Sequence, residues 1–476
     1  MHNIKASHNI NNNFKTVIVS EVLIMGRILT TRRTIIGIVV IFGYFLYNLA
    51  FATSGDSGET AGHSGEVAEV LLGLIIILLA AKLGGDLLER FKQPAVLGEL
   101  IIGMLIGNLA MIGPEIFEPF KYSLTLDVLA ELGVIILLFE VGLESSLQEM
   151  MKVGVAAFMV ATFGVIAPFF LGWGAALFFL PEASIYVHIF VGATLTATSV
   201  GITARVLKDI GKIRTREAKI ILGAAVIDDI MGLIILAVVV GIINAANTGG
   251  AEVGSLDIFL IVAKALGFVI GSILIGNMIM PQVFKFGSKF KVAGILLSTA
   301  LLVCFLMAYL ASLIGLAPIV GAFAAGLILD KVQYKDFTDR GEHSIDELVA
   351  PIGVFLIPIF FVKMGMMVDL STFGNTSILA FAGVMTIMAI AGKQVCSLAI
   401  FDKSINRIAI GLGMIPRGEV GLIFAGIGAK LMLDNSPVVS SGTYSAVVIM
   451  VIITTLVTPP LLKISLLKGD KKKAPA

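Results

Sequence analysis

The chain has 476 residues, of which 57 % are hydrophobic and 14 % charged, and its mean hydropathy is +1.01. The charged fraction lies well below the roughly 25 % of soluble domains, which excludes an ordinary soluble protein and indicates a polytopic membrane protein. The net charge of +1 gives no electrostatic case for nucleic-acid binding, and the two cysteines imply no disulfide framework. The apolar stretches are long enough for helices, so we predict an all-α fold.

The N-terminal region resembles a targeting segment. Residues 1–33 are polar and basic, and the apolar run 34–52 that follows ends in Ala-Phe-Ala. A basic flank, an apolar core and an A-x-A ending are typical of a secretory signal peptide, and an uncleaved extra helix is the alternative for residues 1–52. Residues 53–66 are polar and free of lysine, and we predict that they lie outside the cell membrane.

Residues 67–466 form the predicted membrane domain, in which apolar runs alternate with loops that carry Gly, Pro and charge. We predict about thirteen transmembrane helices, at 67–88, 94–110, 125–143, 153–180, 186–206, 217–243, 256–282, 292–314, 316–330, 346–368, 376–400, 407–430 and 443–465. Lys and Arg gather in every second loop and in the basic tail 467–476, whereas the opposite loops hold little more than Lys121 and Lys430. The positive-inside rule therefore predicts a cytoplasmic C-terminus, in a multi-pass protein of the inner cell membrane.

Two halves of this domain resemble each other. The segment that begins Pro94-Ala-Val-Leu-Gly resembles Pro318-Ile-Val-Gly-Ala, and Leu138-Phe-Glu-Val-Gly resembles Phe361-Val-Lys-Met-Gly at nearly the same offset. An odd number of spans separates equivalent helices, so the two halves have opposite orientations in the membrane. Inverted repeats are a transporter architecture with the binding site near the midplane. We place the first repeat at about 67–243, a linker helix at about 256–282 and the second repeat at about 292–465.

One span in each half is interrupted. In residues 192–201 hydroxyl side chains lie at mid-membrane depth, and those that we single out are Thr196, Thr198 and Ser199. In residues 413–421 the sequence Pro416-Arg417-Gly418-Glu419 combines helix breakers with two charges at membrane depth. Broken helices at matching positions of two repeats are the best sequence indication of a transport site. The alternatives are hydrogen bonding between helices for the hydroxyls, and a kink with an internal Arg417–Glu419 ion pair.

Two adjacent aspartates, Asp228 and Asp229, stand in the middle of the apolar run 217–243. A carboxylate at the bilayer centre costs roughly 2.5–3.5 kcal/mol on insertion scales, and these two are too far from either end of the run to reach water. A functional site is the default interpretation, and a polar pair that joins neighbouring helices is the alternative. Partial dehydration favours the protonated carboxyl, so such a group can hold either a proton or a cation.

Buried acids need a counter-charge. Lys393 stands inside the span 376–400, where it must pair or lose its proton, and we pair it with Asp228 as a hypothesis. Lys363 is the competitor, although it lies closer to the outer end of its span and could reach the surface by snorkelling. Glu140 also lies at depth, where it could line the transport cavity or serve packing.

The three motifs TLTATSVGITARVLKDIG, AAVIDDIMGLIILAVV and GMIPRGEVGLI, in this order, resemble the monovalent cation:proton antiporter superfamily. The two-aspartate branch with its NapA-like sodium/proton antiporters is the closest fit, over about residues 66–466. The resemblance implies a core bundle that moves against a scaffold, which also forms a homodimer in the lipid bilayer. It implies that Asp229 carries the cation (Na+ as the transported metal) and the proton, and that Asp228 pairs with Lys393. Because electroneutral relatives have Asn in place of Asp228, it also implies electrogenic exchange.

The predicted function is exchange of sodium for protons, with Li+ or K+ as other possible ions and no cofactor. Potassium/proton exchange by the same fold is the alternative, since cavity size and ligand number set ion selectivity. A cation channel is a rival of a different class, which the inverted repeats disfavour. We expect no enzyme, because the sequence has no P-loop, H-E-x-x-H or G-x-S-x-G in a credible context.

Overall fold

The computed structural model describes residues 62–91, 93–109, 117–145, 147–249, 254–290, 292–329, 334, 337, 343–402 and 404–473. The predicted segment 1–52 and most of the segment 53–66 lie outside these residues. The chain divides into two compact units, Met1–Ile76 and Ile77–Ala476. The first contributes the beginning of a helix, and the packing described below is that of the second.

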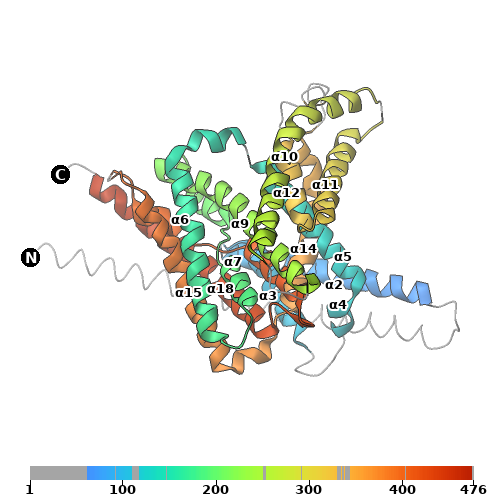
Figure 1. Cartoon of the computed structure of the whole chain (residues 1–476), viewed down its shortest axis with the longest axis horizontal. Coiled ribbons are helices and arrows are strands. Elements are labelled where there is room, and N and C mark those ends of the chain that lie inside the picture. The colour runs from blue at the N-terminus through green and yellow to red at the C-terminus, as the bar shows by residue number, and fades with distance from the viewer. Residues whose placement is uncertain are drawn as a thin grey trace, which may run out of the picture. The chain divides into compact units, whose positions relative to one another are not determined.

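The described chain is almost entirely helical (Figure 1). The α-helices are α2 (Gly62–Arg90), α3 (Ala95–Gly107), α4 (Glu118–Tyr122), α5 (Leu124–Glu144), α6 (Leu147–Phe179), α7 (Ile185–Thr194), α8 (Val200–Asp209), α9 (Arg216–Gly249), α10 (Ser255–Gly287), α11 (Ile295–Leu313), α12 (Pro318–Ile328), α14 (Ile345–Met366), α15 (Thr376–Val395), α16 (Arg407–Gly413), α17 (Glu419–Lys430) and α18 (Ser441–Lys473). Short 3-10 helices, η3 (Leu370–Gly374) and η4 (Cys396–Ala399), adjoin α15. The prediction of an all-α polytopic membrane fold is confirmed.

Eight of the described helices are long and apolar enough to cross a membrane, and α3, α7 and α12 are shorter apolar helices. Each of the thirteen predicted spans coincides with one helix or with two half-helices in sequence. Inside α6, Gly154 has the left-handed φ of +78°, and the apolar part of that helix begins there, as the predicted span 153–180 does. In the described part of the chain, two-residue strands β1 (Met432–Leu433) and β2 (Ser436–Pro437) pair as an antiparallel hairpin after α17.

The helices pack as two bundles joined by α10. In the core bundle, α6 packs against α7, α9 and α15, and α18 packs against α8, α15, α16 and α17. In the scaffold bundle, α14 packs against α3 and α5, and α12 against α5 and α11. Figure 1 shows α6, α15 and α18 on one side and α5, α11 and α12 on the other. The pairing α3–α14 matches α5–α12, and α6–α9 matches α15–α18, as two inverted repeats would require.

Glycines set the spacing inside the scaffold bundle. A Cβ at Gly103 would lie 2.2 Å from the carbonyl oxygen of Val362, and one at Gly365 would lie 2.2 Å from that of Leu100. The same holds between α5 and α12, where a Cβ at Gly142 would lie 2.4 Å from the oxygen of Phe323. Real Cβ atoms do not come this close to backbone, so these helices approach as they do only because the residues are glycine.

Candidate functional site

The first broken helix opens at residues 195–199. α7 ends at Thr194, residues up to Ser199 are non-helical, and Ser199 is the extended residue that precedes α8. Thr and Ser hydroxyls compete for backbone groups, which disfavours a continuous helix here. Thr194, Thr196 and Thr198 are nevertheless all at most 2 % exposed, so this irregular backbone lies inside protein, where a membrane tolerates it.

The second broken helix crosses the first. α16 ends at Gly413 and α17 starts at Glu419; Pro416 between them can donate no backbone hydrogen bond. The backbone N–H of Ser199 donates to the carbonyl of Pro416 at 2.8 Å, which joins the two breaks directly. Thr198 Oγ1 donates to the carbonyl of Met414 at 3.3 Å, so free carbonyls at the end of α16 find partners on the other broken helix.

Arg417 neutralises the ends of two half-helices. Its side chain is completely buried and donates to the carbonyl oxygens of Leu195 at 2.8 Å, Ile415 at 3.0 Å and Met414 at 3.3 Å. Leu195 and Met414 follow directly on α7 and α16, whose C-terminal ends carry partial negative charge. The structure does not show the alternative, an ion pair between Arg417 and Glu419, because the guanidinium of Arg417 donates its hydrogen bonds to these carbonyls instead.

The aspartates lie next to this crossing, and one of them is paired. Lys393 Nζ donates to Asp228 Oδ1 at 2.7 Å and to the carbonyl of Thr196 at 2.7 Å. Asp228 and Lys393 are both 0 % exposed. The pairing proposed from the sequence is therefore present in the structure, and it also ties α15 to the first broken helix. A buried ion pair with further hydrogen bonds is the arrangement in which both charges survive burial.

α6 makes room for the ion pair. Gly392 contacts Pro168 of α6 so closely that a Cβ on it would lie 2.8 Å from the proline Cα. One turn away, a Cβ at Gly164 would lie 3.6 Å from Lys393 Nζ and 3.7 Å from Asp228 Oδ1. Small residues on both helices thus let the lysine lie between them.

Asp229 has no such partner. Its side chain is 5 % exposed, and its Oδ1 has no hydrogen-bond partner; Oδ2 of Asp228 has none either. The charge of Asp229 interacts with those of Asp228 and Glu419. Glu419 is partly buried at the first turn of α17, where the helix dipole favours an anion, and its Oε2 accepts from Ser199 Oγ at 3.2 Å. The site therefore has carboxylate oxygens available to a proton or a cation.

Two other predicted residues lie in the scaffold bundle. Lys363 is 1 % exposed and does not snorkel: its Nζ contacts Asp127 Oδ1 at 2.9 Å and donates to the carbonyls of Phe120 and Lys121. Lys363 is therefore not the counter-charge of the aspartates. Glu140 lies against Gly353 of α14, where a Cβ would come 2.3 Å from Oε1, and that oxygen is buried without a hydrogen-bond partner. Its role in a cavity stays a prediction.

The profile of the family described as "Sodium/hydrogen exchanger, transmembrane" matches residues 74–468. The chain belongs to the sodium/hydrogen exchanger family. As a member of this family it is a multi-pass membrane protein, and the resemblance that its motifs showed is confirmed.

Individual relatives of this exchanger-family chain are named as antiporters. The high-affinity Na+/H+ antiporter NhaS3 of Synechocystis sp. is 40 % identical to it, over 86 % of this chain and 92 % of NhaS3. The Na+/H+-K+ antiporter GerN of Bacillus cereus is 36 % identical, over 85 % of this chain and 98 % of GerN. The solved structure of the sodium proton antiporter MjNhaP1 from Methanocaldococcus jannaschii has a TM-score of 0.62 and 18 % identity, covering 85 % of this chain and 98 % of that one. At that identity the likeness shows the fold.

Some residues of the site carried no sequence signal that we used. Gly164 and Pro168 of α6 shape the space around Lys393, and Thr455 of α18 donates to the backbone carbonyl of Arg417. In an apolar helix such residues look like ordinary packing until their contacts are known. In the part of the chain that the structure describes, no group of three or more His, Cys, Asp or Glu is arranged for a resident metal ion.

Proposed function

We propose that this protein exchanges sodium ions for protons across the inner cell membrane. The observation that carries the proposal is Asp229, a buried carboxylate with an unpartnered oxygen beside the crossing of two broken helices. Relatives that are 40 % and 36 % identical over most of their length are named as Na+/H+ antiporters, which supports the same substrates here.

The chemistry is competition for one site. A dehydrated carboxylate holds a proton or a sodium ion but not both, so binding of one releases the other. Asp229 is the group with free oxygens, and Asp228 is held by Lys393. Both broken helices, both aspartates and the lysine belong to the core bundle, so motion of this bundle against the scaffold would expose the loaded site to each side in turn.

Charge balance makes the exchange electrogenic in our proposal. If two protons are exchanged for one sodium ion, one net charge crosses the membrane in each cycle. The membrane potential then contributes about 2.3 kcal/mol per 100 mV. The Asp228–Lys393 pair supplies the second proton-binding group: Lys393 would lose a proton when sodium binds to the aspartates and would regain one when sodium leaves. We further propose a cytoplasmic C-terminus, a homodimer and no enzymatic activity.

The test is exchange in proteoliposomes with an interior pH dye and a separate probe of membrane potential. Sodium should collapse an imposed proton gradient, at a rate that responds to the potential. Asp229→Asn should lower this rate by at least 100-fold, whereas the same change at the exposed Asp257 of α10 should leave it unchanged. A folded Asp229→Asn protein that exchanges at a near-normal rate would rule out the assignment.

Potassium/proton exchange is the second candidate. GerN, with 36 % identity, is named as a Na+/H+-K+ antiporter, so potassium is added in the same assay. If potassium alone collapses the gradient, the carboxylate site stands and the sodium assignment is wrong. If cations cross without proton movement, the protein is a channel and the exchange mechanism is wrong.

A further inference from the structure

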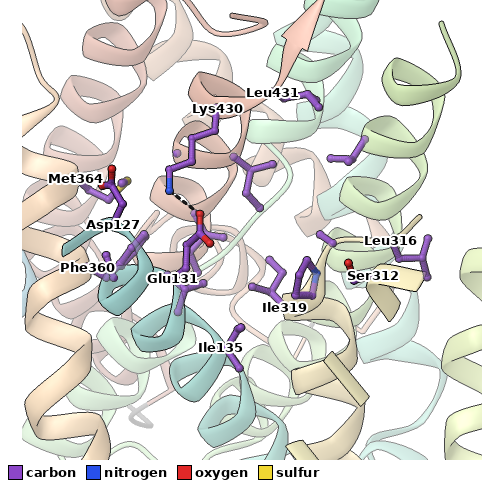
Figure 2. Close-up of a pocket in the computed structure, with 18 of the residues that line it drawn as sticks. Asp127, Glu131, Ile135, Ser312, Leu316, Ile319, Phe360, Met364, Lys430 and Leu431 are labelled. Carbon is purple, nitrogen blue, oxygen red and sulfur yellow. Dashed lines mark hydrogen bonds and ion pairs between the residues drawn. The ribbon is translucent and has the colours of Figure 1, made fainter. Parts of the chain in front are cut away.

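A cavity of about 410 Å³ separates the two bundles at the end where α5 begins and α17 ends (Figure 2). The core bundle lines it with residues of α9 and α17, and the scaffold bundle with residues of α5, α14 and the α11–α12 connection. Most of these side chains are apolar, so across this space the bundles lack the interlocked packing that holds each bundle together. In the proposed orientation this is the outer end of the protein.

One ion pair spans the cavity. Lys430, the last residue of α17, contacts Glu131 of α5 with 2.6 Å between Nζ and Oε1. Figure 2 shows the lysine reaching from one helix to the carboxylate on the other. The side chains are 39 % and 63 % exposed, so water reaches both partners. The contact joins a helix that carries site residue Glu419 to a helix of the scaffold.

The opposite end of the bundles has a comparable contact. Arg205 of α8 and Glu89 of α2 lie 3.7 Å apart, with side chains that are 42 % and 55 % exposed. α8 is the second half of the first broken helix, as α17 is the second half of the second. Among the described residues, the second half of each broken helix thus has an exposed ion pair to another helix, α8 to α2 and α17 to α5.

We propose that Lys430 and Glu131 form a latch that must open and close in every exchange cycle. The inference rests on the proposed function, in which the core bundle moves against the scaffold. Solvent-exposed ion pairs contribute little free energy, so such a latch opens readily. It nevertheless raises the population of the conformation in which it is closed, by a factor of a few. Lys430 and Glu131 thus shift the equilibrium between the two conformations, in which the site faces one side of the membrane or the other.

A second lysine–carboxylate pair, Lys363 with the cavity-lining Asp127, has a different role. Lys363 and Asp127 are 2.9 Å apart, but both belong to the scaffold bundle, and the lysine also holds two backbone carbonyls. Motion of the core bundle leaves this pair intact. The distinction between the two pairs is thus which bundles they join, not their chemistry.

Charge removal tests the bias. Lys430→Gln and Glu131→Gln should each change the ratio of sodium KM values measured from the two sides by the same two- to five-fold factor, with no further change in the double variant. The reversed pair Lys430→Glu with Glu131→Lys should restore the ratio, and high ionic strength should reduce the effect. The control is Arg216→Gln, which removes the exposed 3.2 Å pair with Asp402 inside the core bundle. Unequal or additive effects of the two single changes would contradict the latch.

Cross-linking tests the motion. We would replace Glu131 and Lys430 by cysteine and join them with a cleavable bis-methanethiosulfonate; the native cysteines Cys304 and Cys396 are buried. Exchange should fall at least tenfold and return on reduction, whereas a cross-link between cysteines at 216 and 402 should leave it unchanged. Normal exchange through the cross-linked protein would overturn the latch. If Asp229→Asn still abolishes exchange in that case, the proposed function stands.

Discussion

Helices of the scaffold bundle cross with their backbones in contact, and helices of the core bundle cross in addition around a fully buried ion pair. In the scaffold, a Cβ at Gly365 would overlap the carbonyl of Leu100 at 2.2 Å. The core bundle has such an approach too, at Gly392, where a Cβ would lie 2.8 Å from Pro168 Cα, but at Gly164 the nearest atom is the charged Lys393 Nζ at 3.6 Å. Both bundles have close contacts at glycine, and the core in addition encloses the Asp228–Lys393 ion pair, in which both side chains are 0 % exposed.

The buried ion pair in the core bundle agrees with the part that the proposed mechanism gives to each bundle. At these glycines the backbones of the scaffold helices are in contact, so the helices can pack in only one arrangement. The core bundle keeps unpartnered oxygens on both Asp228 and Asp229 beside the crossing of the broken helices, where a proton or a cation could satisfy them. A rigid frame and a site with an exchangeable ligand are what alternating access requires.

The largest expected effect comes from removing a buried lysine of each bundle. Lys393→Met should cost about 3–5 kcal/mol of stability, because it leaves Asp228 buried without its counter-charge. Exchange should slow and lose its response to membrane potential. Lys363→Met should also lower stability, since it frees Asp127 and two carbonyls, but the remaining exchange should stay electrogenic.

Thermal unfolding in detergent and exchange at clamped potentials measure the two effects separately. A folded Lys393→Met protein whose exchange is still electrogenic would contradict the role of the pair with Asp228. Loss of electrogenicity in Lys363→Met instead would transfer that role to the scaffold lysine.

The sequence predicted the site better than its surroundings. Charges in apolar spans are costly, so Asp228, Lys393 and Arg417 stand out from the sequence alone. The partner of Lys393 could be predicted, because a buried lysine needs an acidic counter-charge and the buried aspartate pair offers one. The partners of Arg417 could not be predicted. They are backbone carbonyls, which are free to accept its hydrogen bonds only because both helices break here.

The prediction for Lys363 shows where sequence reasoning fails. Its position near the end of a span allowed snorkelling, but α4 and the start of α5 cover that end and supply acceptors from Phe120 and Asp127. Glycine contacts such as Gly365 on Leu100 were also unpredictable, because the register between distant helices decides which glycine meets which carbonyl. Helix positions, in contrast, depend on local hydropathy, and each predicted span coincides with one helix or with two half-helices in sequence.

A smaller effect is expected from filling a glycine contact. Gly365→Ala should destabilise the protein by about 1–3 kcal/mol, because the new methyl group meets backbone atoms of Leu100 and Met104 that cannot move aside. Gly383→Ala in α15 is the matched control: nothing lies within 4 Å of its Cβ, and the change should stabilise the helix by about 0.5–1 kcal/mol. Unfolding temperatures measure both. Equal shifts in unfolding temperature at Gly365 and Gly383 would mean that α3 and α14 can move apart to admit the methyl group, and that their contact is not tight.

The smallest effect concerns the hydroxyl at the crossing of the broken helices. Ser199→Ala removes the 3.2 Å hydrogen bond to Glu419, a long contact for a hydroxyl donor, while the backbone bond from Ser199 to Pro416 remains. The sodium KM should therefore change about two- to five-fold with little loss of stability. Ser272→Ala in α10, whose hydroxyl bonds to its own helix at Phe268, should change neither quantity. If Ser199→Ala instead lowers the unfolding temperature and leaves KM unchanged, its hydroxyl has a structural role, and the ligands of the cation lie closer to Asp229.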